Sequence, residues 1–473
     1  MVFNSYLFAF FFVVVFVCYQ LNYQWRLKKL FLLIMSWLFY AAWNLPYLLI
    51  IIFSTIVDFY AAKKIYRADS QKGKRFWLFV SLTANLGVLS YFKYGEFLLV
   101  NTTNLLAQFG IIYEPMPWSV LLPIGISFYT FQTLTYSLDV FKGRMRPDAG
   151  FLDFAVFVAF FPQLVAGPIV RARRFLPQLK VQPKVSADQL GWALVLFLIG
   201  LFEKVVLADG LFAPVVDSVY EHDEILPAST VILANFAFMG QIFADFSGYS
   251  LMAIGVALSL GFVLPVNFRA PFSAIGYADF WQRWHISMSS WFRDYLYASI
   301  KSKRSRSIYN IMYAQLLTMT IIGLWHGASW TFVFWGAFNG FVLMTELWLR
   351  YKIGHWPVWH TTLAQILFWA LTMLLLSQSA VLFRAEDLSQ TGLMLTSLFN
   401  IQDSNFDVPM LNTALVLICL TGLFLAHWQL RHRPLREVVD AMPLSVVTVL
   451  GALAVFSIAV IGSSADEFIY FQF

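Results

Sequence analysis

The chain has 473 residues, of which 60% are hydrophobic and only 12% are charged. Soluble domains average about 45–50% apolar and about 25% charged residues, so this chain has too little polar surface to cover a globule of its length. The composition indicates an integral membrane protein and excludes a secreted disulfide scaffold, a disordered chain and an ordinary soluble enzyme. The net charge of +6 is typical of basic cytoplasmic loops, and no basic stretch carries the interleaved aromatics of a nucleic-acid groove.

Apolar stretches along the chain predict an all-α polytopic fold of roughly 11–13 transmembrane or re-entrant helices, because each is long enough to cross about 30 Å of hydrocarbon. No repeat or linker separates a second folding unit, so residues 1–473 are expected to form a single membrane domain. The clearest stretches begin near Phe3, Leu30, Tyr47, Phe76, Phe151, Leu190, Val231, Met312, Trp330, Leu363, Leu411 and Leu444.

Charge sets the expected orientation of these spans. The first stretch lacks a positive n-region and a small-residue cleavage site, so it is expected to remain as a membrane span. Basic residues follow the first span at 26–29 and the third at 63–75, whereas the link at 44–46 has no charge. The positive-inside rule therefore predicts an outward N-terminus, and an outward C-terminus after one last span. By the same rule three later basic segments are cytoplasmic: 171–184, 301–307 and 431–437.

Polar side chains interrupt the apolar segment 121–143 in two helical stripes. One stripe holds Gln132, Tyr136 and Asp139 at i, i+4 and i+7. Unpaired polar groups at membrane depth are costly unless they line a cavity or a site. Hydrogen bonding between neighbouring spans explains such a stripe about equally well.

Prolines and a glycine interrupt the next segment, 156–175. Pro162, Gly167 and Pro168 must break or bend a helix there and free backbone carbonyls, and such breaks at depth usually border a cavity. The three arginines that follow fit either plain topogenic charge, which is the simpler reading, or contact with a phosphorylated donor. They are Arg171, Arg173 and Arg174.

A carboxylate and a histidine mark the third segment. Asp245 lies within a long apolar stretch, where an ionisable residue is by default a sign of function. The Trp- and Arg-rich run that follows places His285 and Ser289 on one helical face, with Arg283 nearby, and suits an interfacial or re-entrant helix. Taken alone, His285 is more simply explained as an interface histidine bonded to backbone or a carboxylate.

His326 is the only ionisable residue within the long apolar stretch 316–340. Gly323 and Gly327 allow close backbone approach there, and Trp325 and Trp330 are placed to wall the imidazole. A desolvated histidine stays neutral and is well suited to take a proton from a hydroxyl near neutral pH. The alternative is a buried histidine that bridges two spans.

Several common chemistries are poorly supported by the sequence. It contains no Gly-x-Ser-x-Gly elbow, nucleotide-binding loop, His-Glu-x-x-His zinc helix or dinucleotide fingerprint. Its two cysteines, Cys18 and Cys419, have no metal-ligand spacing. No metal site or bound cofactor is therefore expected.

Five segments in order resemble the membrane-bound O-acyltransferase family, in the bacterial branch of the alginate O-acetylation membrane subunit and the teichoic acid D-alanine transferase. The resemblance covers most of the chain to about Trp348, with core motifs in 121–348. The segments read IGISFYTFQTLTYSLDVFKG, FFPQLVAGPIVR, FADFSGYSLMAIG, FWQRWHISMSSWFRDYLY and GLWHGASWTFVFWGAFNG.

The resemblance implies helices around a central tunnel, with the family's invariant histidine at His326 and its second histidine position at His285. It implies that an acyl group arrives on a cytoplasmic thioester, acetyl-coenzyme A or an acyl carrier, and leaves toward the outer face. The aromatic tail 466–473 resembles a terminal motif of this branch, in which Tyr470 would relay the acyl group. Interfacial anchoring by the aromatics is the alternative reading of this tail.

The expected activity is O-acyl transfer, with acetyl as the expected group, across the bacterial inner membrane to a polysaccharide such as alginate or another exopolysaccharide. Neutral His326 would deprotonate the acceptor hydroxyl, with His285 and Tyr470 as further catalytic residues. The residues expected to orient base or donor are Asp245, Gln132, Trp325, Ser289 and Arg283. The family also implies a periplasmic acetyltransferase partner and membrane lipid around the chain.

Two other classes of function remain as alternatives. A transporter or lipid-linked sugar flippase would explain polar stripes and a buried carboxylate, but such folds often show matching halves that this chain lacks. A noncatalytic scaffold of an exopolysaccharide machine would explain the aromatic tail, but it gives no reason for a lone histidine at depth.

Overall fold

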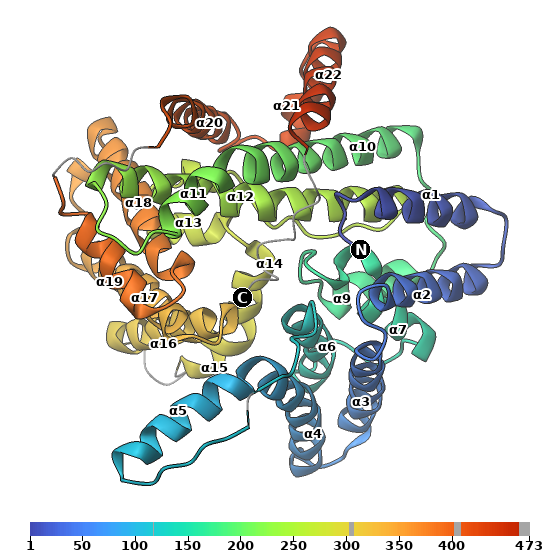
Figure 1. The fold of residues 1–473 in the computed structure, drawn as a ribbon. Helices are drawn as coiled ribbons and strands as arrows, with labels where there is room; N and C mark the ends of the chain where they lie inside the picture. The colour runs from blue at the N-terminus through green and yellow to red at the C-terminus, as the bar shows by residue number, and fades with distance from the viewer. Residues whose placement is uncertain (117, 302–306, 402–407, 463–473) are drawn as a thin grey trace. The chain divides into compact units, whose positions relative to one another are not determined.

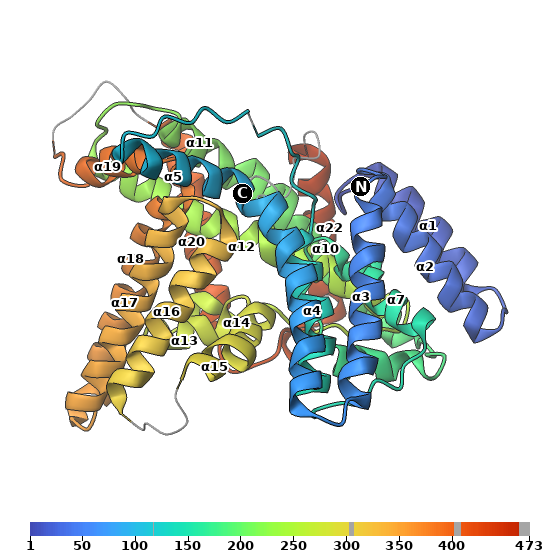
Figure 2. The same ribbon diagram turned by 90° about the horizontal axis from the view of Figure 1, so that it is seen from below.

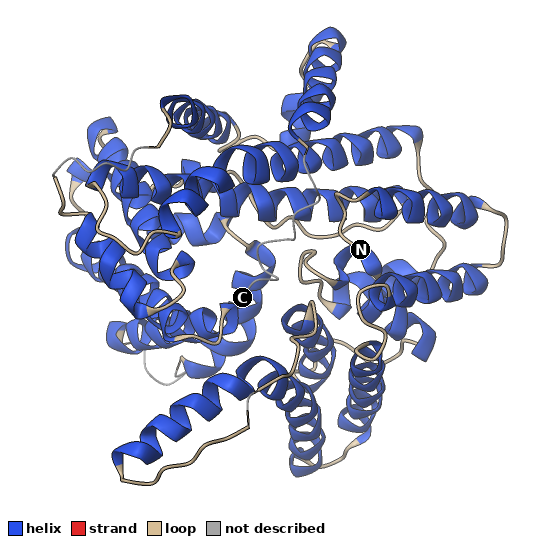
Figure 3. Ribbon diagram, viewed as in Figure 1, coloured by secondary structure: helices blue, strands red, loops and turns tan. Residues whose placement is uncertain are grey.

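The computed structural model describes residues 1–473 except 117, 302–306, 402–407 and 463–473. The described residues form helices and loops, with no strand among them (Figure 3). The all-α prediction is therefore confirmed. The helices group into two compact units, one of Met1–Leu194 with Ala253–Pro265 and one of Val195–Met252 with Val266–Phe473. That residues 1–473 act as one domain stays a prediction.

Seven helical stretches within the described part of the chain are long and apolar enough to cross a membrane, so this is a multi-pass membrane protein. The sequence count of spans also included shorter or more polar helices, such as the 15-residue Tyr6–Gln20. Each predicted start lies in or next to a described helix. The seven spans are Ala187–Tyr220, Ala228–Ser259, Ile308–His326, Trp330–Ile353, Thr362–Arg384, Met410–Gln429 and Leu444–Ile461.

The first unit is built largely from helices of the N-terminal part of the chain (Figure 1). A buried Asp58 links three of them, since it accepts hydrogen bonds from Ser81, from Asn85 at 2.8 Å and from Ser137 at 2.9 Å. Part of the polar character of segment 121–143 thus serves contacts between helices. The helices are α1 (Tyr6–Gln20), α2 (Trp25–Ala41), α3 (Leu48–Arg67), α4 (Gln71–Leu89), α5 (Gly95–Gln108), α6 (Ile126–Phe141), α7 (Phe151–Ala159), α8 (Phe161–Leu164) and α9 (Ala172–Phe175), with the start of α10 (Ala187–Phe202).

The break predicted at Pro162 is confirmed. α7 ends at Ala159, and the short α8 begins after Phe160. One backbone donor freed by the break is satisfied, because the N–H of Phe161 donates to Ser36 Oγ at 3.1 Å. Gly125, with φ +75°, allows α6 to start against this break, where a Cβ would lie 2.9 Å from the carbonyl oxygen of Leu164.

In the second unit, α16, α17 and α18 lie side by side in both ribbon views (Figures 1 and 2). α16 and α17 touch at glycines: a Cβ on Gly323 would lie 2.2 Å from the carbonyl oxygen of Phe332, and one on Gly336 would lie 2.4 Å from that of Met319. The helices of this unit after α10 are α11 (Ala213–Tyr220), α12 (Ala228–Ser259, whose end from Ala253 belongs to the first unit), α13 (Tyr277–Arg283), α14 (Ile286–Phe292), α15 (Ala298–Ile300), α16 (Ile308–His326), α17 (Trp330–Ile353), α18 (Thr362–Arg384), α19 (Leu388–Ser397), α20 (Met410–Gln429), α21 (Leu435–Asp440) and α22 (Leu444–Ile461).

Candidate functional site

His326 is the last residue of α16 and is only 4% exposed. The chain turns sharply after it, and only glycine fits at 327, where a Cβ would lie 2.1 Å from the ring of Phe332. Ser329 then caps α17, because its Oγ accepts from the backbone N–H of Thr331 at 3.2 Å. The tight corner between α16 and α17 therefore fixes the imidazole inside the unit.

Three aromatic rings enclose the imidazole of His326. Their centroids lie 5.0 Å away for Trp325, 5.2 Å for Trp335 and 5.4 Å for Phe383, all at steep angles to the imidazole plane. The prediction named Trp325 and Trp330 for this wall, but Trp330 is 47% exposed and is not one of these three rings. Trp335 and Phe383 come from α17 and α18. Such a wall excludes bulk water from a reacting group.

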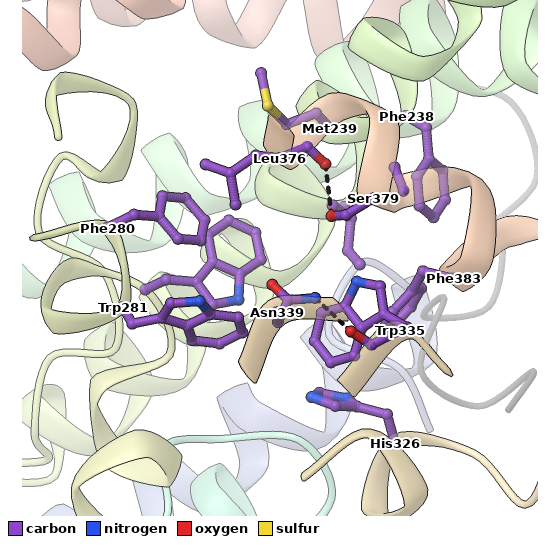
Figure 4. A pocket seen from close by; sticks show the side chains of 13 residues that line it. Phe238, Met239, Phe280, Trp281, His326, Trp335, Asn339, Leu376, Ser379 and Phe383 are labelled. Atoms are coloured by element: carbon purple, nitrogen blue, oxygen red, sulfur yellow. Dashed lines mark hydrogen bonds between the residues drawn. The ribbon is translucent and has the colours of Figure 1, made fainter. Parts of the chain in front are cut away.

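A cavity of about 60 Å³ opens beside His326. A water-sized group needs about 10–15 Å³ by this measure, so the cavity has room for about four of them. Figure 4 shows His326 at one end of the labelled group, near Asn339 and Trp335. Asn339 is held firmly, since its Oδ1 accepts from Tyr277 Oη and its Nδ2 donates to the carbonyl oxygen of Trp335, both at 2.7 Å.

His285 lies between α13 and α14 in a left-handed backbone conformation with φ +42°, which is unusual for a residue other than glycine. Asn267 holds this turn: its backbone carbonyl oxygen accepts from Ile286 N at 2.8 Å and its side-chain Oδ1 accepts from Ser287 N at 3.3 Å. The ring is fully buried and meets Phe246 edge-on at 4.5 Å. Burial lowers the pKa of His285 to about 3, so the imidazole is neutral at cellular pH.

Trp325 is the shared neighbour of the two histidines. Its ring centroid lies 6.2 Å from that of His285 and 5.0 Å from that of His326. The structure thus brings together both histidines that the sequence singled out, on two sides of one tryptophan.

Ser289 makes a local contact, whereas Arg283 contacts its own helix and also donates from Nη1 to the carbonyl oxygen of Arg431 at 3.3 Å. Arg283 Nε lies 2.8 Å from Asp279 Oδ1, and Ser289 Oγ donates to the carbonyl oxygen of Ile286 at 3.4 Å. Neither belongs to the described wall of the cavity beside His326. Their predicted role toward the donor stays a prediction.

Asp245 lies in α12 and pairs with Lys204, at 2.7 Å between carboxylate oxygen and Nζ. Lys204 belongs to a π-helical stretch, Glu203–Phe212, and lies equally close to Asp209. This stretch and α12 meet closely, because a Cβ on Gly248 would fall 2.9 Å from the backbone nitrogen of Lys204. The predicted functional carboxylate is therefore part of a buried group of three charges.

The two remaining predicted residues lie elsewhere. Gln132 belongs to α6 of the first unit, where its side chain donates to the carbonyl oxygen of Phe157, as that of Gln163 does at 2.7 Å. Tyr470 lies outside the described residues. The roles of both stay predictions.

The sequence analysis missed most of the cavity wall. Trp335 and Asn339 stand four residues apart just after the His326 corner, a spacing that places both on one face of α17 and was readable from the sequence. The sequence gives no such spacing for Phe383, because its proximity to His326 depends on which helices are neighbours. The residues missed are Phe238, Met239, Ile242, Phe280, Trp281, Trp284, Trp335, Asn339, Leu376, Ser379, Ala380 and Phe383.

The sequence of residues 140–383 matches that of the membrane-bound O-acyltransferase family. The matched range contains both histidines and the whole described wall of the cavity. The chain belongs to this family. The acyltransferase is 36% identical over 406 residues to the probable alginate O-acetylase AlgI of Azotobacter vinelandii, covering 85% of this chain and 79% of that protein.

Two further relatives extend the similarity. The probable alginate O-acetylase AlgI of Pseudomonas putida is 33% identical over the whole of both chains. The peptidoglycan O-acetyltransferase of Helicobacter pylori is 35% identical over 389 residues, which cover 76% of this acyltransferase and 71% of the relative. The protein is therefore an O-acyltransferase, and the expected enzyme class is confirmed.

Proposed function

We propose that this O-acyltransferase moves an acetyl group from a cytoplasmic thioester across the bacterial inner membrane to hydroxyls of an extracellular polysaccharide. The observation that carries the proposal is the placement of His326, which lies buried at a small aromatic cavity in a chain of this family. A transporter or a passive scaffold needs no such enclosed imidazole.

The chemistry follows from the position of His326. The imidazole takes the proton from the acceptor hydroxyl as the oxygen attacks the thioester carbonyl carbon. The new C–O bond forms, the C–S bond breaks, and the proton passes from the imidazolium to the departing thiolate. The aromatic wall limits attack by water, which would otherwise hydrolyse the donor.

Cavity size favours acetyl as the transferred group. A volume of about 60 Å³ accepts the few heavy atoms of an acetyl group, whereas a long acyl chain exceeds it. Acetyl-coenzyme A or an acetylated carrier protein is the donor whose acyl group fits a cavity of this volume. The names of the relatives describe O-acetylation of alginate and of peptidoglycan, both of which are glycans with free hydroxyls.

Alginate or a related exopolysaccharide is the acceptor we favour, because the alginate relative from Pseudomonas putida aligns along the whole chain. A periplasmic acetyltransferase would complete the transfer, with Tyr470 at the outer mouth as the relay. This arrangement needs both termini on the outer side, as the charge pattern predicts.

Membrane vesicles of both orientations test donor and direction. Radiolabelled acetyl-coenzyme A is added to vesicles that contain wild type, His326→Ala or His360→Ala, the last being an exposed histidine that serves as the matched control. We expect label to enter polysaccharide only in inside-out vesicles, with wild type and His360→Ala alike and His326→Ala inactive. Equal labelling by His326→Ala, or labelling only in right-side-out vesicles, contradicts the proposal.

A further inference from the structure

A second cavity lies in the first unit, far larger than the one beside His326, with a volume of about 500 Å³. Residues from the end of α1, the start of α2 and the segment 182–190 line it. Two lysines, Lys28 and Lys184, share the wall with Tyr19, Phe16 and Leu190. The cavity thus combines cations with apolar surface, and the chemistry of the enzyme uses none of these residues.

Lys28 is the unusual member of this group. Its side chain is buried, at 6% exposure, and its Nζ lies 5.3 Å from the ring centroid of Tyr19. No carboxylate of the described residues forms an ion pair with it, whereas the neighbouring Lys29 pairs with Asp153. The Lys28 ammonium thus has no counter-ion among the described residues, and an anion in the cavity would satisfy it.

Tyr19 adds a second polar group without a partner. Its hydroxyl is buried and has no hydrogen-bond partner among the described residues. A phosphate oxygen in the cavity would accept from the Lys28 ammonium. Lys184 is exposed at the rim of the same cavity and adds positive charge there.

We propose that this cavity binds the phosphate of an anionic phospholipid. The apolar residues favour a lipid over a free phosphate, because Phe16 and Leu190 line the same cavity and the α1 surface is apolar and open, with Phe10 70% and Val17 55% exposed. The charge pattern places this end of α1 at the cytoplasmic face, where anionic lipids meet basic pockets between helices.

Lipid retention on the purified full-length chain tests the proposal. Binding of phosphatidylglycerol, phosphatidylcholine and water-soluble glycerol phosphate is compared by native mass spectrometry and by thermal unfolding. The variants are Lys28→Met, Lys28→Arg and, as the matched control, Lys72→Met, an exposed lysine at the start of α4.

We expect phosphatidylglycerol, but not phosphatidylcholine, to stay bound and to raise the unfolding temperature of wild type. Lys28→Met should bind it about tenfold more weakly, the loss expected for one charge-assisted contact. That variant should still fold, with an unfolding temperature in phosphatidylcholine close to that of wild type, because it breaks no ion pair with a described residue. Lys28→Arg and Lys72→Met should bind as wild type does.

Two results overturn the proposal. Equal binding of phosphatidylglycerol by Lys28→Met and wild type would show that the cavity is not the lipid site. Displacement of the lipid by glycerol phosphate, with the same stabilisation, would assign the site to a free phosphate compound.

Discussion

The aromatic wall beside His326 should set the length of the acyl group. Phe383 lines the cavity, and its ring centroid lies 5.4 Å from that of the imidazole. Phe383→Leu keeps the position apolar but removes part of the wall, so the variant should accept longer acyl groups. Phe332→Leu is the matched control, because Phe332 packs on Phe383 at 4.9 Å but is not part of the described lining.

The size of the effect follows from the burial of methylenes. Each buried methylene contributes about 0.8 kcal/mol, and butyryl has two more than acetyl, so the change reaches at most about 1.6 kcal/mol. That energy corresponds to about a 15-fold rise in the ratio of kcat/KM for butyryl over acetyl. The wild-type cavity of about 60 Å³ has little room for the two extra methylenes of butyryl, so wild type should not show this rise.

The assay follows release of free thiol from acetyl-, butyryl- and octanoyl-coenzyme A by inside-out membrane vesicles that contain the enzyme, its periplasmic acetyltransferase partner and the polysaccharide acceptor. We expect wild type and Phe332→Leu to prefer acetyl strongly, and Phe383→Leu to raise the butyryl ratio several-fold or more. If both variants keep the wild-type ratio, the cavity does not hold the acyl group and the argument from its size is refuted.

Three further predictions concern the residues around the site. Gly323→Ala should destabilise the protein by about 1–3 kcal/mol and reduce transfer, because the added Cβ would lie 2.2 Å from a backbone oxygen. Gly87→Ala is the control: its Cβ would meet nothing within 4 Å, so the unfolding temperature should stay the same or rise. Lys204→Met leaves the carboxylates of Asp245 and Asp209 without their cation and should lower the free energy of unfolding by about 3–5 kcal/mol. Adding Asp245→Asn should recover part of the unfolding temperature, and no recovery would argue against the pairing of Lys204 with Asp245. Burial lowers the pKa of His285 to about 3 in the folded protein, whereas the unfolded value is about 6.5. Between these two pH values the unfolded state binds more protons than the folded state. The free energy of unfolding therefore falls as the pH drops below about 6.5, by about 2 kcal/mol at pH 5. His285→Asn, which tolerates the left-handed backbone, should lose this part of the pH dependence of thermal unfolding, and an unchanged profile would contradict it.

The sequence carried enough information for the helices and for the central histidine. Apolar length predicts spans directly, and Pro162 predicts the break after α7, because both effects are local. His326 stood out because an ionisable group at membrane depth is rare without a reason.

Partners across helices were not predictable from the sequence. Lys204 lies at the end of an apolar stretch, and nothing local indicates that it pairs with Asp245. Phe383 likewise reaches His326 only because α18 packs beside α17. Apolar helices in a membrane have similar lipid-facing surfaces, so hydropathy alone does not say which of them are neighbours.

The ester content of surface polysaccharide tests the central role of His326 most directly. A strain that lacks the protein is complemented at matched expression with wild type, His326→Ala or His360→Ala, and the ester is measured by mass and infrared signal. The account predicts that ester disappears in the deletion strain, returns with wild type and His360→Ala, and stays absent with His326→Ala. Full restoration of ester by His326→Ala would contradict it.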